Sequence, residues 1–359
     1  MNKIEFGDCR ETMRKWATQG VKAQTCITSP PYYGLRDYGT AKWEGGDVNC
    51  DHVESENKHG GQRADRNQVG YKKQFKDLCK KCGSVREDKQ IGLEETPEEY
   101  IKAMVEVFRC VWDVLEDDGT LWVNIGDSYY NYRPGKGQAL VQQSVSNNIQ
   151  DLPQVCARRG NKLEGLKEKD LIGIPWMLAF ALRADGWYLR QDIIWSKPNP
   201  MPESVQDRCT KAHEYIFLLS KSHKYHFDHV AIKDPMKGEP EARDKNAEGY
   251  QADYSKGDRF SKGERVFGAD GMANKRSVWT VNTKPYSGAH FAVFPTELIE
   301  PCILAGAPVG GIVLDPFMGS GTTAQVAQDL GRQYIGCELN PEYGNLQKKR
   351  TAQISLDFA

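Results

Sequence analysis

The segment 313-VLDPFMGSGTTAQVAQDLGRQYIGCELNPEY-343 constrains the fold of this chain more than any other stretch. An apolar run ends at Asp315, a loop with Gly319 and Gly321 follows, and a helix is expected to begin at Thr322. A second apolar run then ends at Glu338. A strand, a helix and another strand in this order predict two parallel strands joined by a crossover helix, because parallel neighbours need such a connection.

Similar alternation along the chain predicts a single α/β domain with a doubly wound, mostly parallel sheet. Thr96, Pro97 and Glu99 form a capping box that opens a helix, which we expect to end at Gly119. Further helices are predicted at 171–184, 295–305 and 341–353, and strands at 4–6, 24–28, 121–125, 188–195 and 215–219.

Three polar stretches, 43–90, 129–169 and 233–275, interrupt this pattern and are predicted to be insertions within one domain spanning 1–359. The net charge of −1 argues against a protein that coats nucleic acid, but it allows one local basic face. The chain has no apolar run long enough to span a bilayer and no apolar signal region at its start. We therefore expect a soluble cytoplasmic protein.

The glycine loop near the C-terminus indicates a ribosyl cofactor, because glycines let the backbone approach it and Glu338 can bind two ribose hydroxyls. The full G-x-G-x-x-G spacing is absent, since Thr323 and Ala324 follow Gly321. Asp315 at the loop would also repel a pyrophosphate. A cationic cofactor such as S-adenosylmethionine fits better than a dinucleotide, and the alternative is a tightly packed helix start without a ligand.

The stretch 26-CITSPPYYG-34 ends a predicted strand with two prolines and two tyrosines. Together with DPFMGSGTT (315–323), GCELNPEY (336–343), WSKPNPMPESVQDRCTKAHEYIFLLSK (195–221) and HFAVFPTELIEP (290–301), it resembles the amino-methyltransferases of DNA. The catalytic turn comes early and the cofactor loop late, which is similar to the circularly permuted beta class.

The resemblance implies a seven-stranded, Rossmann-like methyltransferase sheet in which the strand at Ile4 neighbours the strand that ends at Glu338. Asp8 would then lie near the adenine or ribose of S-adenosylmethionine. The resemblance gives the remaining cofactor residues as Phe294, Asp315, Phe317, Gly319, Gly321, Thr322, Thr323 and Glu338.

The resemblance also assigns chemistry to Ser29, Pro30, Pro31 and Tyr32. The Ser29 hydroxyl and the Pro30 carbonyl would accept the hydrogens of an exocyclic amine, the prolines would fix their direction, and Tyr32 would stack on a flipped-out base of double-stranded DNA. A serine at the first position is typical of cytosine N4 methylation. One alternative is methylation of adenine N6, and another is a zinc-knuckle DNA-binding protein with a degenerate methyltransferase core. The sequence does not decide whether the protein has a cognate restriction endonuclease as a partner.

The first insertion contains Cys50-x-His52 and Cys79-x-x-Cys82-Gly83. This spacing is typical of a structural zinc site with four protein ligands, which would staple a segment too polar to build its own core. His59 could replace His52, and unconnected loop residues are the alternative. All three insertions are candidates for recognition of the DNA target.

Overall fold

An eight-stranded sheet forms the centre of the computed structural model, which describes residues 1–34, 40–57, 71–75, 78–130, 163–235, 271–284 and 294–352. Its strand order is β1-β14-β13-β2-β7-β9-β8-β12. The bounds are β1 Lys3–Phe6, β2 Ala23–Thr28, β7 Leu115–Ile125, β8 Tyr188–Ser196, β9 His213–Ser220, β12 Val278–Thr280, β13 Ile312–Asp315 and β14 Gln333–Glu338. In this sheet β9 runs antiparallel to its neighbours, β7 and β8, and the other pairs are parallel. The prediction of a mostly parallel sheet is confirmed.

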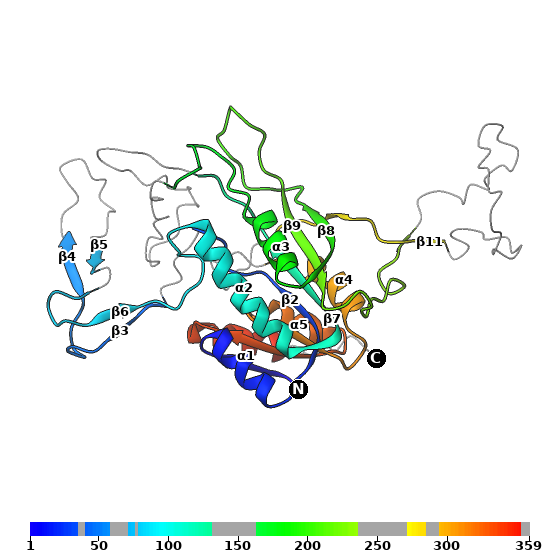
Figure 1. Cartoon of the computed structure of the whole chain (residues 1–359), viewed down its shortest axis with the longest axis horizontal. Helices are drawn as coiled ribbons and strands as arrows, with labels where there is room; N and C mark the ends of the chain where they lie inside the picture. Colours follow the sequence, from blue (N-terminus) through cyan, green and yellow to red (C-terminus); the bar gives the residue numbers. More distant parts are fainter. Residues whose placement is uncertain are drawn as a thin grey trace, which may run out of the picture.

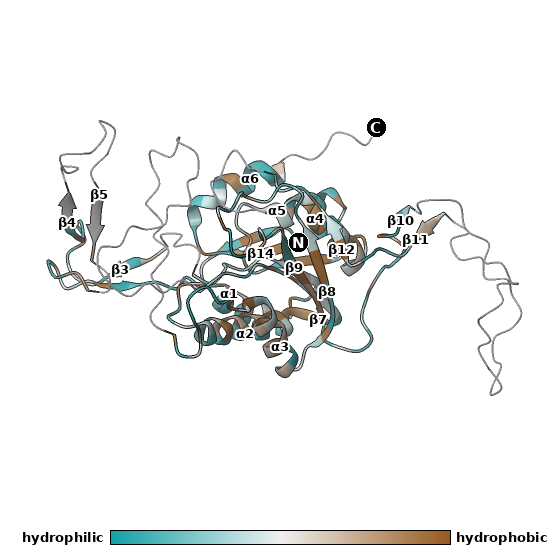
Figure 2. Cartoon of the chain, turned by 90° about the horizontal axis from the view of Figure 1, so that it is seen from above, coloured by the Kyte–Doolittle hydropathy of each residue, from teal (hydrophilic) through white to brown (hydrophobic). Residues whose placement is uncertain are grey.

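Helices cover both faces of this sheet (Figure 1, Figure 2). One face carries α1 Cys9–Thr18, α2 Pro97–Val114 and α3 Ile174–Ala184, and the other carries α4 Thr296–Gly306, α5 Thr322–Asp329 and α6 Gly344–Ala352. A short 3-10 helix, Pro341–Tyr343, precedes α6. The first face buries Trp16 and Phe108 and the second buries Trp122 and Leu298, so each face has its own apolar core.

Two expectations from the sequence are wrong, one about the number of strands and one about the end of helix α2. The sheet has eight strands instead of seven, because the three-residue β12 pairs with β8 and buries Trp279. A strand of this length carries no period that a sequence pattern could reveal. Helix α2 ends at Val114 and not at Gly119, because Gly119 lies inside β7. A Cβ at Gly119 would lie 2.9 Å from the Glu116 carbonyl oxygen.

Helix α1 was not predicted from the sequence, although its signals are present. Asp8 is its N-cap and accepts a hydrogen bond from the Arg10 amide, while Cys9, Met13 and Trp16 recur at helical spacing and are buried. The predicted capping box of α2 is confirmed, with Thr96 and Glu99 bonded reciprocally.

The described part of the first insertion lies outside the large sheet (Figure 1). Strand β3 Lys42–Glu44 pairs with β6 Val85–Glu87, and β4 Val53–Asn57 pairs with β5 Tyr71–Gln74. A third pair, β10 Asp234–Pro235 and β11 Met272–Ala273, borders the last insertion. Residues 131–162 and 236–270, most of the other two insertions, lie outside the described residues, so the division at 43–90, 129–169 and 233–275 remains a prediction. No helix in the described ranges is long and apolar enough to cross a membrane.

Candidate functional site

The Ser29–Tyr32 turn and the glycine loop lie side by side because β2 and β13 are parallel neighbours. Thr25 pairs with Val313 and Cys26 with Leu314, so both strands end at the same edge of the sheet. On the other side of β13, β14 brings Glu338 to that edge, and β1 pairs Phe6 with Glu338. The predicted adjacency of the first and last strands is confirmed.

A cavity of about 150 Å³ opens at this edge and collects six of the predicted residues. They are Asp8, Ser29, Pro31, Phe317, Gly319 and Glu338. The lining also includes Thr40, Lys89, Gln90 and Ile91, which lie at the two ends of the first insertion. Residues as far apart in the sequence as Asp8 and Glu338 therefore form one site.

Glu338 is buried at the wall of the cavity, and its carboxylate has a fixed orientation. The Gly319 amide donates to Oε2 at 2.7 Å and the Asn340 amide donates to Oε1 at 2.8 Å. Burial raises the pKa of Glu338 to about 7, because a charged carboxylate loses hydration there. An oriented carboxylate of this kind can accept hydrogen bonds from two vicinal hydroxyls.

Asp315 is fully buried, and its carboxylate contacts other residues of the protein instead of facing the cavity as its position in the loop suggested. Its carboxylate accepts hydrogen bonds from the Thr28 hydroxyl at 2.7 Å, the Thr323 hydroxyl at 2.6 Å and the Phe317 amide at 3.0 Å. Burial raises its pKa to about 6. The Thr28–Asp315 bond ties the end of β2, one residue before the Ser29–Tyr32 turn, to the glycine loop.

The remaining predicted cofactor residues, Gly321, Thr322, Thr323 and Phe294, are not among those that line the cavity. Gly321 adopts a φ of 90° at the start of α5, and a Cβ there would lie 3.3 Å from the Gln347 Cα. Thr322 accepts a hydrogen bond from Arg350, and Phe294 packs against the core under α4. Asp8 does line the cavity, while its carboxylate forms an ion pair with Arg10 at 2.6 Å.

The Ser29–Tyr32 turn is braced from the α2 side. Pro30 is buried, and the Pro31 carbonyl accepts a hydrogen bond from the Tyr100 hydroxyl at 2.9 Å. Gly92 has a φ of 100°, and a Cβ there would lie 3.1 Å from the Tyr32 carbonyl oxygen. The prolines and these contacts hold the turn in one conformation.

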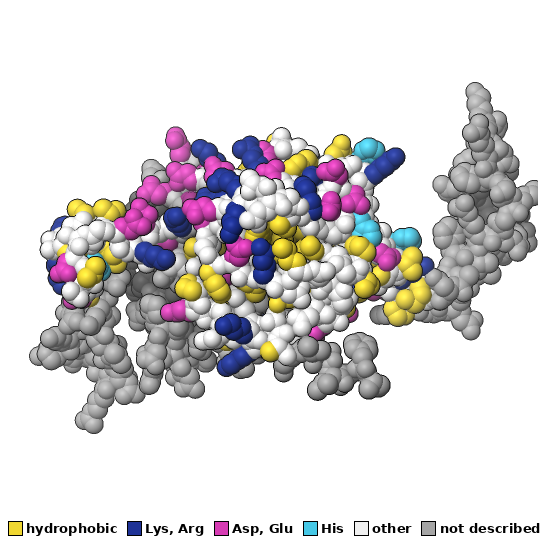
Figure 3. Space-filling model, turned by 90° about the horizontal axis from the view of Figure 1, so that it is seen from below, with side chains coloured by type: hydrophobic (Ala, Val, Ile, Leu, Met, Phe, Trp, Pro, Cys, Tyr) yellow, Lys and Arg dark blue, Asp and Glu magenta, His cyan; other side chains and the backbone are white. Residues whose placement is uncertain are grey.

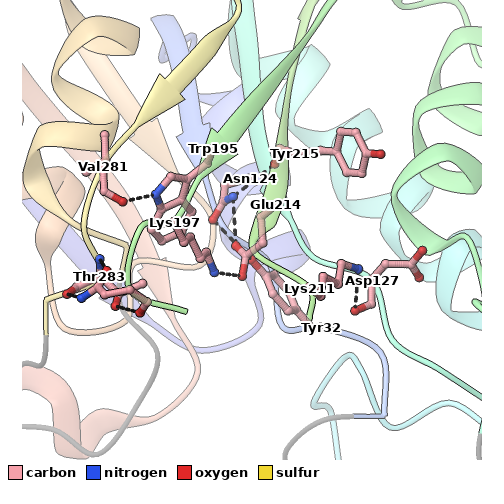
Figure 4. Close-up of polar contacts among 11 residues, drawn as sticks. Tyr32, Asn124, Asp127, Trp195, Lys197, Lys211, Glu214, Tyr215, Val281 and Thr283 are labelled. Atoms are coloured by element: carbon pink, nitrogen blue, oxygen red, sulfur yellow. Dashed lines mark hydrogen bonds and ion pairs between the residues drawn. The ribbon is translucent and has the colours of Figure 1, made fainter. Parts of the chain in front are cut away.

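Tyr32 meets a polar network that sequence reasoning missed (Figure 4). Its hydroxyl donates to Glu214 Oε2 at 2.7 Å, and Asn124 Oδ1 lies 3.3 Å away. Lys197 forms an ion pair with the other oxygen of Glu214. The only sequence signal was that Lys197 and Glu214 lie within the segment 195–221, which contributed to the family resemblance as a whole.

The four predicted metal ligands come together in the first insertion. The ligand atoms of Cys50, His52, Cys79 and Cys82 all lie within 4.8 Å of one another. The Cys79 amide donates to the Ser84 carbonyl and the Gly83 amide to the Cys79 carbonyl, each at 2.8 Å. These bonds close the knuckle that directs both of its sulfurs to one side. His59 lies outside the described residues.

Comparison with known proteins places these features in a family. The family model described as DNA methylase, for N6 and N4 enzymes, matches residues 23–349. The type II methyltransferase M.SmaI of Serratia marcescens is 42% identical over 97% of this chain and 90% of its own length. M.Cfr9I of Citrobacter freundii, also a type II methyltransferase, is 40% identical over 96% of this chain and 85% of its own.

Solved structures share the fold at low sequence identity. The cytosine-N4-specific PvuII DNA methyltransferase has a TM-score of 0.54 at 15% identity, covering 100% of this chain and 88% of its own. TTHA0409 from Thermus thermophilus, solved in complex with S-adenosyl-L-methionine, has a TM-score of 0.51 at 20% identity and covers 100% and 96%. With the family match over most of its length, this chain belongs to the N6/N4 DNA methylases, the amino-methyltransferases of DNA.

Proposed function

We propose that this protein transfers a methyl group from S-adenosylmethionine to the exocyclic N4 of cytosine in double-stranded DNA. The observation that carries the proposal is that Ser29 of the catalytic turn and Glu338 of the cofactor unit line the same cavity. The motif order, with the turn at 28–32 and the glycine loop at 315–323, supports the permuted beta class.

S-adenosylmethionine would supply the methyl group as an electrophile carried on a sulfonium. Glu338 is the residue we assign to the ribose hydroxyls, since its two oxygens are oriented by backbone amides. Asp8 and Phe317 line the same cavity and are assigned to the adenosine moiety, with Gly319 providing close backbone approach. Asp315, Gly321, Thr322 and Thr323 would then support the loop, and Phe294 would support the cofactor through the core that it contacts.

The amine of cytosine is a weak nucleophile because its lone pair is delocalised into the ring. The Ser29 hydroxyl and the Pro30 carbonyl would accept its two hydrogens and favour a more tetrahedral nitrogen. The rigid Pro30-Pro31 turn keeps these acceptors in place, which lowers the cost of ordering the reactants. The methyl group would pass directly from the sulfonium to nitrogen, leaving S-adenosylhomocysteine as the neutral thioether, and the methylated amine would release one proton to solvent. Tyr32 would stack on the base after it has left the duplex.

Ser29 supports cytosine over adenine as the target, because a serine at this position of the turn is typical of N4 methylation. The experiment is to incubate the protein with double-stranded DNA and labelled S-adenosylmethionine, then to digest the DNA and identify the modified nucleoside by mass spectrometry. We expect N4-methylcytosine. N6-methyladenine would overturn the assignment of the base and leave the amino-methyltransferase intact.

The rival from another class is an inert DNA-binding protein that keeps only the methyltransferase core. Calorimetry with S-adenosylmethionine separates the two. Binding without transfer would point to an unsuitable DNA substrate, and sequencing across a mixed-sequence DNA would find the recognition site. Neither binding nor transfer would favour the inert protein.

A structural zinc ion fits the Cys50, His52, Cys79 and Cys82 cluster in its dimensions. Tetrahedral coordination with Zn–S of about 2.3 Å and Zn–N of about 2.0 Å places two sulfurs about 3.8 Å apart and a sulfur and a nitrogen about 3.6 Å apart. The Cys50–Cys79 sulfurs are 3.7 Å apart, and Cys82 Sγ lies 3.6 Å from His52 Nδ1. Disulfide bonding would need sulfurs about 2.0 Å apart.

With four protein ligands the zinc would be structural, holding together an insertion that has few apolar residues. Elemental analysis of the purified protein should give one zinc per chain. Less than stoichiometric zinc in protein purified without chelator would remove the proposal.

DNA is the proposed macromolecular partner, and the type II relatives support a cognate restriction endonuclease as the second. On the face drawn in Figure 3, acidic and basic side chains of the described residues are interspersed. Phosphates would therefore be bound elsewhere, and the insertions 43–90, 129–169 and 233–275 are the proposed recognition elements. Because the substrate is cellular DNA, the cytoplasm is the compartment we propose.

A further inference from the structure

The hydroxyl of Tyr32 belongs to a polar network of four side chains that come from separate strand ends (Figure 4). Tyr32 follows β2, Asn124 lies in β7, Glu214 lies in β9 and Lys197 directly follows β8. The shortest of their contacts to the phenol is the 2.7 Å hydrogen bond to Glu214 Oε2. The Tyr32 side chain is therefore anchored to the antiparallel part of the sheet and not to the cofactor loop.

Glu214 is held by more than one partner. Its side chain is 17% exposed, that of Lys197 is 16% exposed, and the two form an ion pair. The Asn124 amide donates to Glu214 Oε2 at 3.3 Å and to the Tyr215 carbonyl at 3.1 Å. The ammonium of Lys197 also lies 4.1 Å from the centre of the Trp195 ring. These contacts hold the carboxylate in one place, where it accepts the hydrogen bond of the phenol.

The Tyr32 ring is also fixed by its shape. A Cβ at Gly126 would lie 2.7 Å from Tyr32 Cε2 and 3.4 Å from Glu214 Cγ, so the ring lies directly against this backbone. The hydrogen bond to Glu214 keeps the ring from swinging about the Cα–Cβ bond, and the Gly126 backbone against its edge restricts rotation about the ring axis. Burial and the neighbouring Glu214 raise the pKa of Tyr32 well above its ordinary value, so the phenol stays a donor.

We propose that Glu214 is a positioning residue for the methyl transfer, which acts by holding the Tyr32 ring in the position from which it stacks on the target base. Lys197 is its counterion. This inference rests on the proposed function, in which Tyr32 contacts the flipped-out base. Since Glu214 is not among the residues that line the cofactor cavity, its effect falls on the base and leaves cofactor binding unchanged.

Three variants distinguish this positioning role from a contribution of Glu214 to the stability of the sheet alone. Tyr32→Phe removes only the hydroxyl, Glu214→Gln removes the charge while keeping an amide oxygen as an acceptor, and the double variant combines them. The matched control is Asp185→Asn, which breaks the surface ion pair with Arg109 between α2 and α3. Tm is measured for each variant, and kcat, the KM for S-adenosylmethionine and the KM for DNA are determined at saturating co-substrate.

We expect kcat to fall about 10-fold in Tyr32→Phe, as for a lost hydrogen bond to a charged group, and by a similar or smaller factor in Glu214→Gln. The double variant should be no slower than the slower single variant, because both changes remove the same interaction. The KM for S-adenosylmethionine should stay at the wild-type value, and Asp185→Asn should keep wild-type kcat.

A second readout follows the base itself. With 2-aminopurine at the target position, the change in fluorescence on binding reports how the flipped base is stacked, and we expect both single variants to shift it in the same direction. Losses that multiply in the double variant, or a Tyr32→Phe variant with wild-type kcat, would overturn the positioning role. Neither outcome touches the proposed function, which fails if the wild-type protein does not form N4-methylcytosine in double-stranded DNA.

Discussion

The two sides of the catalytic turn are built in different ways. On the cofactor side, Gly319, Asn340 and Glu338 hold one another within one strand–helix–strand unit, and each contact joins residues fewer than 20 positions apart. On the base side, Tyr32, Asn124, Lys197 and Glu214 come from segments separated by as many as 182 positions. The first arrangement is local and the second exists only after the sheet has formed.

The difference predicts which substitutions should disturb each side. Backbone amides orient Glu338, so substitutions of distant side chains should leave it in place. The orientation of Tyr32 depends on side chains of three other strands, so each of them should affect the base and not the cofactor. Thr28 and Asp315 connect the two sides through a buried hydrogen bond of 2.7 Å.

The largest effect should come from removing the base side altogether. We expect Ser29→Ala combined with Tyr32→Ala to lower the rate of DNA methylation by at least about 100-fold, since both the amine acceptor and the stacking ring are lost. The measurement is transfer of labelled methyl to DNA, with calorimetry as the control. Binding of S-adenosylmethionine should persist, and methylation at the wild-type rate would refute the assignment of the turn.

Breaking the link between the two sides should lower stability. Thr28→Val removes the donor to the buried Asp315, and we expect the free energy of unfolding to fall by about 1–3 kcal/mol. Denaturant unfolding measures this change.

Thr28→Ser keeps the hydroxyl and is the matched control, which should retain most of the stability. An equal loss in the serine and valine variants would mean that the methyl group matters and the hydrogen bond does not.

Changes in pH should act on the cofactor side through Glu338. Its pKa is about 7 in the folded protein against 4.5 ordinarily, so the folded state binds more protons than the unfolded state between these values. The contribution of Glu338 to stability is therefore lost as pH rises from about 4.5 to about 7. Affinity for S-adenosylmethionine should rise over the upper part of this range, because ribose hydroxyls donate better to a carboxylate.

Glu338→Gln tests both trends with the same protein. The free energy of unfolding of the free enzyme and the affinity for the cofactor are each measured between pH 5 and pH 8, about 3 units that span the ionisation of Glu338. In Glu338→Gln both should lose the part of their pH dependence that comes from Glu338. A dependence that persists unchanged in this variant belongs to another group, such as the amine of the cofactor.

The smallest effect should come from the metal. Thr40, Lys89 and Gln90 line the cofactor cavity and lie at the two ends of the insertion that carries the cysteine cluster. We expect a chelator to weaken binding of S-adenosylmethionine by about 3–10-fold, because loss of the metal would let these lining residues move and reduce the binding free energy by about 1 kcal/mol. Cys82→Ser should bind as weakly as the chelated protein and respond no further, and unchanged affinity in both would disconnect the insertion from the cavity.

Much of the cofactor side could be predicted from the sequence. The pattern around Asp315, Gly319 and Glu338 is local, and periodicity together with glycine and carboxylate chemistry is enough to recognise a strand, a turn and a helix. The Cys50–Cys82 cluster was predicted for the same reason, since the spacing of knuckle ligands is set by one turn of backbone.

Only the tertiary structure decided what Asp315, Tyr32 and Glu214 contact. From its position in the loop Asp315 was expected to face the cofactor, but parallel pairing of β2 and β13 brings Thr28 to it and directs the carboxylate inward. Glu214 reaches Tyr32 because β9 runs antiparallel beside β7, a register that no local pattern encodes. The sequence by itself, through its family resemblance, predicted the chemistry of the Ser29–Tyr32 turn. Strand pairing determined what holds that turn in place, because long-range contacts depend on the order and register of the strands.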